Sequence, residues 1–121
     1  MGTITSHRDL IAWQEALTLV EIVYRETAKF PREETFGLKT QIRRAAVSVP
    51  SNIAEGSARI TTGELVQFLG IARGSLEELE TQLELAVRLG FLTEATAATT
   101  QANRVGKLVS ALLRSLQRRV A

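Results

Sequence analysis

The sequence predicts an all-α protein, an antiparallel up-down-up-down bundle of four helices that forms a single domain over residues 1–121. Apolar residues recur with helical period in four segments. Pro31 and Gly90 fall where this period breaks, and no β-branched run alternates as a strand would. The predicted helices span about 7–29, 34–58, 62–89 and 94–119, and their short connections favour antiparallel packing.

The first predicted helix carries two apolar stripes. We expect it to begin after Ser6, whose hydroxyl can cap it, and to end before Pro31. The stripe expected to face the core contains Leu10, Trp13, Leu17, Val20 and Tyr24. The second stripe contains Ala12, Ala16, Leu19, Val23 and Thr27. Two stripes exceed what one core requires, so we expect Ala16 and Val23 to lie in an oligomer interface.

The second predicted helix has a proline inside it. Its apolar face contains Leu38, Ile42, Ala45, Val49 and Ile53. Pro50 removes a backbone hydrogen bond to the carbonyl of Ala46 and crowds that carbonyl. We therefore expect a kink at Pro50 rather than a restart of the helix at Ser51.

The third predicted helix has the clearest boundaries in the sequence. Thr61 and Glu64 form a capping box at its start, and Gly90 ends it. Its core face contains Leu65, Phe68, Leu69, Ala72, Leu76, Leu79, Leu83, Ala86 and Val87. A secondary apolar stripe contains Ile71, Leu85 and Leu89, and we expect these three residues to lie in the oligomer interface.

The fourth predicted helix combines an apolar face with a basic one. Thr93 and Glu94 are expected to cap it. Its core face contains Val105, Leu108, Val109, Leu112, Leu113 and Leu116. On the opposite face lie Arg104, Lys107, Arg114 and Arg118, within about 80° on an ideal helical wheel. We call these four residues the basic stripe of the fourth helix.

The composition argues against several classes of function. There is no cysteine and only one histidine, His7, so the chain offers neither a thiolate metal site nor a catalytic triad. The glycines lie in or beside predicted helices and do not form a phosphate loop between a strand and a helix. We expect no enzymatic activity, no cofactor and no bound metal. No apolar run is long enough to span a membrane, so we expect a soluble, cytoplasmic protein.

Polar residues on the second and third helices suggest a structural network. Glu78 lies on the secondary stripe of the third helix, where burial against a neighbouring subunit would require a polar partner. The network predicted from this position contains Ser48, Asn52, Glu55, Ser75, Glu78 and Gln82. By contrast, Glu77, Glu80 and Glu84 point away from the leucine face and are expected to be solvated.

The basic stripe of the fourth helix is the strongest candidate for a ligand surface. Most of the 15 basic residues are arginine, which suits phosphate and carboxylate recognition, and Glu94 is the only acidic residue after Glu84. We expect the stripe to bind the backbone of RNA or DNA with little base specificity, and Arg43, Arg44 and Lys39 to extend it. The alternative is an ordinary solvated face, but repetition of the stripe around an oligomer favours binding.

The sequence resembles a known family over nearly its whole length. Residues 41–56 (QIRRAAVSVPSNIAEG) are similar to the signature of the 23S rRNA-intervening sequence four-helix bundle proteins. Phe68, Leu69 and Ala72, residues 74–83 (GSLEELETQL) and residues 89–92 (LGFL) resemble the family's third helix and its exit. Trp13 fits the first helix.

This resemblance implies an antiparallel four-helix bundle that assembles as a ring-like homopentamer. The family is related to the accessory variability proteins of diversity-generating retroelements, which bind nucleic acid and a reverse transcriptase. The resemblance therefore implies that RNA or DNA and a reverse-transcriptase-like protein are partners of this chain. The alternative function is a protein-binding adaptor or scaffold whose cations provide only solubility.

Overall fold

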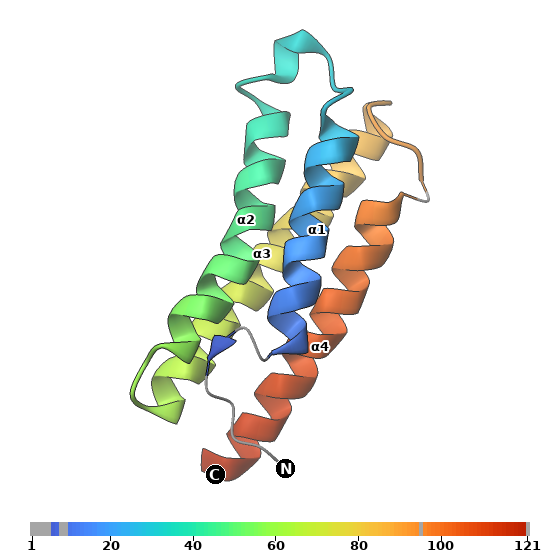
Figure 1. Ribbon diagram of the computed structural model, residues 1–121. Helices are drawn as coiled ribbons and strands as arrows, with labels where there is room; N and C mark the ends of the chain where they lie inside the picture. The colour runs from blue at the N-terminus through green and yellow to red at the C-terminus, as the bar shows by residue number, and fades with distance from the viewer. Residues whose placement is uncertain (1–5, 8–9, 95, 121) are drawn as a thin grey trace.

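The computed structural model describes residues 6–7, 10–94 and 96–120 of the chain and shows a bundle of four α-helices. They are α1 (Ile11–Thr27), α2 (Leu38–Ser57), α3 (Thr62–Arg88) and α4 (Ala97–Val120), and a short 3-10 helix, η2 (Arg32–Glu34), lies between α1 and α2. The prediction of an all-α helical bundle is confirmed. Figure 1 shows α1 and α3 running upward and α2 and α4 running downward.

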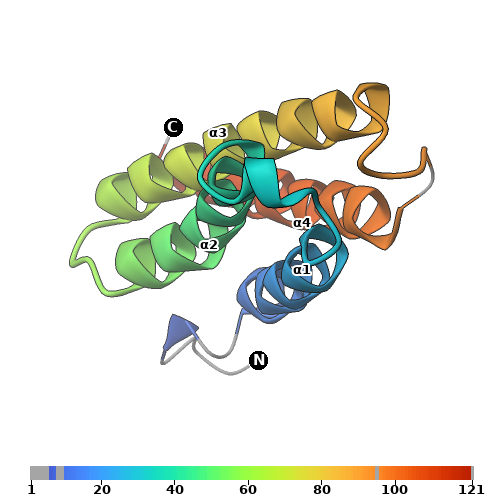
Figure 2. The same ribbon diagram turned by 90° about the horizontal axis from the view of Figure 1, so that it is seen from above.

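Each helix packs against two neighbours, in the order α1, α2, α3, α4 around the bundle (Figure 2). The α2–α3 contact is the most extensive, and the diagonal pairs α1–α3 and α2–α4 make no contact within the described residues. The buried apolar residues form one cluster to which all four helices contribute, including Leu19, Ile42, Leu79 and Val109.

The stripe of α1 expected to lie in an interface forms the centre of its core face. The stripe expected to face the core is only partly buried: Leu10 is buried, and Trp13 and Val20 pack against the core. Ala16, Leu19 and Val23 are fully buried in the core of this chain, whereas Leu17 and Tyr24 are 38% and 43% exposed. The assignment of Ala16 and Val23 to an oligomer interface is therefore wrong. Both stripes are apolar and share one period, so periodicity alone does not decide which one faces the other helices.

Helix α1 begins later than predicted, and Ser6 does not cap it. Its first residue is Ile11, and Leu10, which precedes it, provides no side-chain cap. At the other end, Phe30 is buried and its ring lies 5.4 Å from that of Phe91, which follows α3. This aromatic contact joins the two connections at the same end of the bundle.

Helix α2 passes through Pro50 without ending, and Pro50 itself is buried. The kink expected there stays a prediction. The first turn of α2 is capped from outside, because the Glu34 carboxylate accepts a hydrogen bond from the backbone N–H of Leu38 at 3.0 Å. An acidic side chain at this position also complements the positive end of the helix dipole.

The predicted boundaries of α3 are confirmed. The Thr61 hydroxyl accepts a hydrogen bond from the backbone N–H of Glu64 at 3.2 Å, as in a capping box. Gly90, with φ of 83°, follows the helix, and the Phe91 N–H donates to the Ala86 carbonyl at 2.8 Å. This pairing is that of a Schellman ending, in which glycine adopts the left-handed conformation without steric cost.

Helix α4 begins at Ala97, so the expected cap at Thr93 is wrong. The Thr96 hydroxyl accepts from the N–H of Thr99 at 3.1 Å. Glu26 of α1 accepts from the N–H groups of Ala97 and Ala98 at 3.1 and 3.4 Å. A carboxylate from another helix therefore satisfies the free donors at the start of α4.

The close approach of α2 and α3 depends on Gly56. A Cβ atom at this position would lie 2.8 Å from Phe68 Cβ and 3.1 Å from Leu65 Cδ1. We predict that Gly56→Ala lowers the free energy of unfolding by about 1–3 kcal/mol, because α2 and α3 must move apart to relieve the overlap. Urea denaturation followed by circular dichroism measures the change.

Gly74→Ala is the matched control for this substitution. A Cβ atom there meets nothing within 4 Å, and Gly74 lies inside α3. Its substitution should raise stability by about 0.5–1 kcal/mol through helix propensity alone. Equal effects of the two substitutions would contradict the close approach at Gly56.

Candidate nucleic-acid interface

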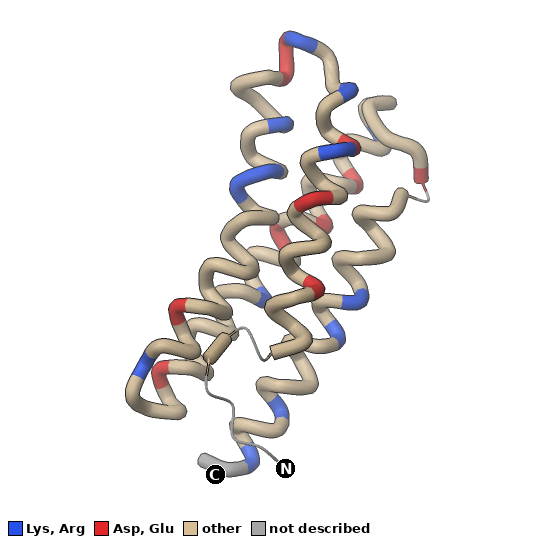
Figure 3. Tube along the Cα trace, in the orientation of Figure 1, with Lys and Arg blue, Asp and Glu red and all other residues tan. Residues whose placement is uncertain are grey.

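The basic stripe of the fourth helix, or α4 basic stripe, lies on the outer surface of the bundle. Arg104, Lys107, Arg114 and Arg118 are all exposed, while Val105 and Val109 on the opposite side of α4 are fully buried. Figure 3 shows the positively charged positions following one another along the C-terminal part of α4. The sequence of α4 contains no acidic residue. The stripe therefore lacks neutralising charges on its own helix.

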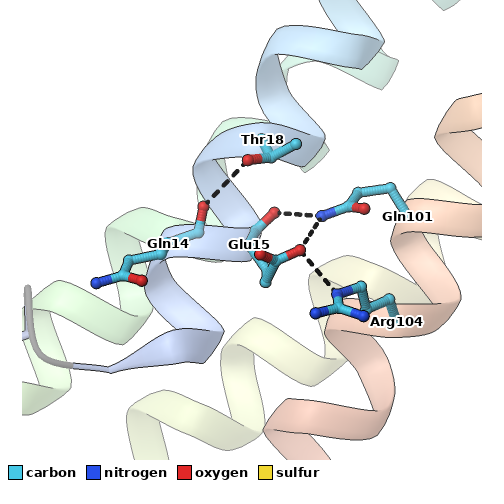
Figure 4. Close-up of polar contacts among 5 residues, drawn as sticks. All are labelled: Gln14, Glu15, Thr18, Gln101 and Arg104. Atoms are coloured by element: carbon cyan, nitrogen blue, oxygen red, sulfur yellow. Dashed lines mark hydrogen bonds and ion pairs between the residues drawn. The ribbon is translucent and has the colours of Figure 1, made fainter.

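Arg104 differs from the rest of the stripe because it is paired with α1 (Figure 4). Its Nε donates to Oε1 of Glu15 at 2.8 Å. The Gln101 amide donates to the same carboxylate oxygen and to the Glu15 carbonyl, both at 2.9 Å. Hydrogen bonds from Gln101 and then Arg104 lower the pKa of Glu15. Arg104 thus joins α1 to α4. Lys107, Arg114 and Arg118 form no ion pair with another described residue, and we call them the free part of the stripe, although the Arg118 Nε donates to the Arg114 carbonyl at 3.3 Å.

Arg43 is also held within the fold. Its Nε donates to the Thr27 hydroxyl at 2.9 Å, and a terminal nitrogen donates to the Tyr24 carbonyl at 3.1 Å. Its guanidinium carbon lies 4.2 Å from the centre of the Tyr24 ring. Arg43 therefore closes the C-terminal end of α1, where backbone carbonyls lack partners within the helix.

The expected extension of the α4 basic stripe onto α2 is wrong. Arg43, Arg44 and Lys39 lie on α2, which is diagonal to α4 and makes no contact with it within the described residues. Figure 3 places the basic positions of α2 near one end of the bundle and those of α4 toward the other. Arg44 is exposed and lines a shallow hollow with Tyr24 and Val47. The two basic regions are separate surfaces.

A groove between α3 and α4 adds a cation that the sequence analysis did not include. Arg73 of α3 lines the same hollow as Lys107 and Arg114 of α4, together with Ser110. By periodicity, Arg73 falls on the side of α3 away from the leucine face, as a solvated residue would. Antiparallel packing of α3 on α4 brings Arg73 beside the basic end of α4. The expected packing of these two helices is the signal that could have identified Arg73.

The other half of this groove is acidic. Glu80 and Asn103 line both the basic hollow and an adjoining one, so the two are continuous. The second hollow also contains Glu84 and Glu94. Burial, and then the charge of Glu77, raises the pKa of Glu80. We call this continuous feature the α3–α4 groove.

Three members of the predicted polar network come together between α2 and α3. The hydroxyls of Ser48 and Ser75 lie 2.8 Å apart. The Asn52 amide donates to the carbonyl and the hydroxyl of Ser48 at 2.8 and 3.0 Å. These residues therefore connect the two helices that form the largest contact.

The other three predicted members do not join this network. Glu55 forms a partly exposed ion pair with Arg59 at 3.3 Å. Glu78 is exposed, so its expected burial does not occur within this chain. Gln82 is buried, and its Oε1 has no hydrogen-bond partner among the described residues.

The secondary stripe of α3 is exposed, as an interface between subunits requires. Ile71, Leu85 and Leu89 are 47%, 46% and 59% exposed. We call these residues the α3 apolar stripe. It provides an apolar surface on the outside of the bundle that the four-helix core leaves uncovered.

The described part of the chain offers neither a cluster of metal ligands nor a helix that could span a membrane. No group of three or more histidine, cysteine, aspartate or glutamate side chains there is arranged to hold a metal ion. None of the helices, over the residues described, is long and apolar enough to cross a membrane.

The fold and the surface together define an all-α helix-bundle protein with a basic outer face. A family model described as 23S rRNA-intervening sequence protein matches residues 8–111. The chain belongs to this family. The family resemblance predicted from the motifs in α2 and α3 is confirmed.

A solved structure supports the fold. It is a crystal structure of a protein with unknown function from the S23 ribosomal protein family of Bacteroides thetaiotaomicron VPI-5482. The two chains are 20% identical and superpose with a TM-score of 0.79, over 85% of this chain and 98% of the other. A search of curated proteins finds no match to this chain.

The Glu15 contacts give a prediction for the pH dependence of stability. A carboxyl group whose pKa is lowered in the folded state stabilises the protein above its unfolded-state pKa, and this stabilisation is lost as the pH falls through the folded pKa. We predict that Glu15→Gln is less stable than the original chain at pH 7, and that the difference shrinks below about pH 4.

Urea denaturation over a pH series measures this difference. Glu21→Gln, at an exposed position of the same helix, controls for the loss of one carboxylate. A stability difference for Glu15→Gln that stays constant across the series would show that its carboxylate makes no specific contact with Arg104 and Gln101.

Proposed function

We propose that this chain is a non-catalytic, oligomeric protein of the cytoplasm that binds the backbone of RNA or DNA through the basic surface of α4. The observation that carries the proposal is the exposure of Lys107, Arg114 and Arg118 on a helix without acidic residues. Such a surface gains affinity for phosphates by releasing counterions, without reading bases. The descriptions of the family and of the Bacteroides protein both refer to ribosomal components, which favours RNA.

Neutralising the free part of the stripe tests this proposal. The variant Lys107→Gln/Arg114→Gln/Arg118→Gln leaves Arg104 in its contact with Glu15. We predict weaker binding of a fluorescently labelled 20-nucleotide RNA. The slope of log affinity against log salt should fall by about 2 per protomer, since each cation on a single strand contributes about 0.7. Fluorescence anisotropy over a salt series provides both values.

A control variant carries the same net charge with its substitutions elsewhere. Arg25, Lys29 and Arg32 are exposed at the C-terminal end of α1 and in η2. Their replacement by glutamine should leave most of the affinity intact. Equal affinities of the two variants would show that net charge, rather than the α4 surface, determines binding.

The proposed oligomer is a homopentamer in which the α3 apolar stripe contacts the neighbouring subunit. A stable interface buries about 800 Å² on each partner, and exposed leucine and isoleucine side chains provide apolar area for it. Closed symmetry would place the basic surface of α4 around the whole assembly. This arrangement would let one nucleic acid contact several protomers.

Leu85→Arg tests the interface. Because Leu85 is 46% exposed, we predict that a charge there dissociates the oligomer while helix content is retained. Static light scattering gives the mass, and circular dichroism gives the helicity. Ile60→Arg, at a position 98% exposed in the α2–α3 turn, should leave the mass unchanged. A monomeric original chain, or an unchanged mass of Leu85→Arg, would contradict the interface.

A protein-binding adaptor is the second candidate function. It is favoured by the exposed apolar residues of α1 and α2, among them Leu17, Tyr24 and Val47, which the α3 apolar stripe does not include. In that case a protein, such as one resembling a reverse transcriptase, would cover this surface. Retention of a partner after nuclease treatment, with no measurable RNA or DNA affinity, would favour the adaptor.

A further inference from the structure

The α3–α4 groove has opposite charges at its two ends. At the end toward the C-terminus of α4, Arg73 faces the same hollow as Lys107 and Arg114. Ser110, Glu77 and Glu80 also line this hollow, and the two glutamates follow Arg73 along α3 toward the acidic half. All three cations are exposed, and none forms an ion pair with another described residue. Their guanidinium and ammonium groups are therefore available to an external anion.

The acidic half of the groove restricts where such an anion can lie. Glu80, Glu84 and Glu94 line the hollow toward the N-terminus of α4. A polyanion that followed α4 along its full length would place phosphates beside these carboxylates. The negatively charged phosphates and carboxylates would repel one another, which opposes binding. Because Glu80 is partly buried, solvent screens its charge less.

We propose that a single strand of nucleic acid crosses the bundle at the basic end of the α3–α4 groove, with its phosphates held by Arg73, Lys107 and Arg114, instead of following α4. This inference rests on the proposed function and specifies the path of the ligand. Arginine provides paired N–H donors that match phosphate oxygens, and the Ser110 hydroxyl adds a further donor.

The placement of the cations favours one strand over a duplex. The cations come from both walls of the groove, and an extended strand is able to contact both at once. The acidic half then limits the number of phosphates held by each protomer.

Two substitutions in α3 with opposite expected effects test the path. Arg73→Gln should weaken binding of a labelled 20-nucleotide oligouridylate and lower its salt slope by about 0.7 per protomer. Glu80→Gln should strengthen binding, because it removes a charge that repels the strand. Arg25→Gln is the control, since Arg25 is exposed on α1, which does not line the groove. It should not weaken binding.

Two further measurements define the ligand. The affinity for a 20-base-pair duplex should fall less on Arg73→Gln substitution than the affinity for the single strand does. Uridine monophosphate at the same phosphate concentration should not displace the strand. Equal dependence of the duplex on Arg73, or full displacement by the monophosphate, would overturn the inference of a bound strand. Circular dichroism of each variant verifies that the helices are intact.

The outcomes separate this inference from the proposed function. If Arg73→Gln and Glu80→Gln bind as the original chain does, while the triple α4 variant binds weakly, the path through the groove is wrong and α4 remains the binding surface. If the original chain binds neither RNA nor DNA, both proposals are overturned. Opposite shifts for Arg73→Gln and Glu80→Gln would support the path.

Discussion

The packing of α2 against α3 is the constraint on which the rest of the bundle depends. Gly56 allows the two helices to approach near their connecting turn, because any side chain there would overlap Phe68 and Leu65. Farther along the same contact, Ser48 and Ser75 form a hydrogen bond, and Asn52 reinforces it. These contacts fix the distance and the register of the helix pair. The buried faces of α1 and α4 then complete the core around it.

Helices α1 and α4 are joined to each other by polar contacts as well as by the core. Glu26 of α1 caps the start of α4, and Glu15 holds Gln101 and Arg104 farther along it. These contacts determine which side of α4 faces outward. They also divide its basic residues, since Arg104 stabilises the bundle while Lys107 and Arg114 face the α3–α4 groove. The position of the candidate ligand surface thus follows from the contacts that hold α4 in place.

Local signals in the sequence predicted the helices well, and long-range contacts account for the differences. The capping box at Thr61 and the ending at Gly90 depend on neighbouring residues, so they could be recognised directly. The start of α4 could not, because part of its cap comes from Glu26, about 70 residues earlier in the chain. The face of α1 that is most deeply buried was not identified, because both of its stripes are apolar with the same period. For the candidate site, the outward face of α4 was predicted, whereas the roles of Arg43, Arg104 and Arg73 depend on partners from other helices.

The proposed site for nucleic acid is the α3–α4 surface rather than the basic residues as a whole. Photocrosslinking tests this proposal most directly: RNA containing 4-thiouridine is irradiated with the intact protein, and the attached peptides are identified by mass spectrometry. We predict crosslinks within residues 73–80 of α3 and 103–118 of α4. Crosslinks concentrated around Arg43 and Arg44 on α2, or spread evenly over the four helices, would contradict it.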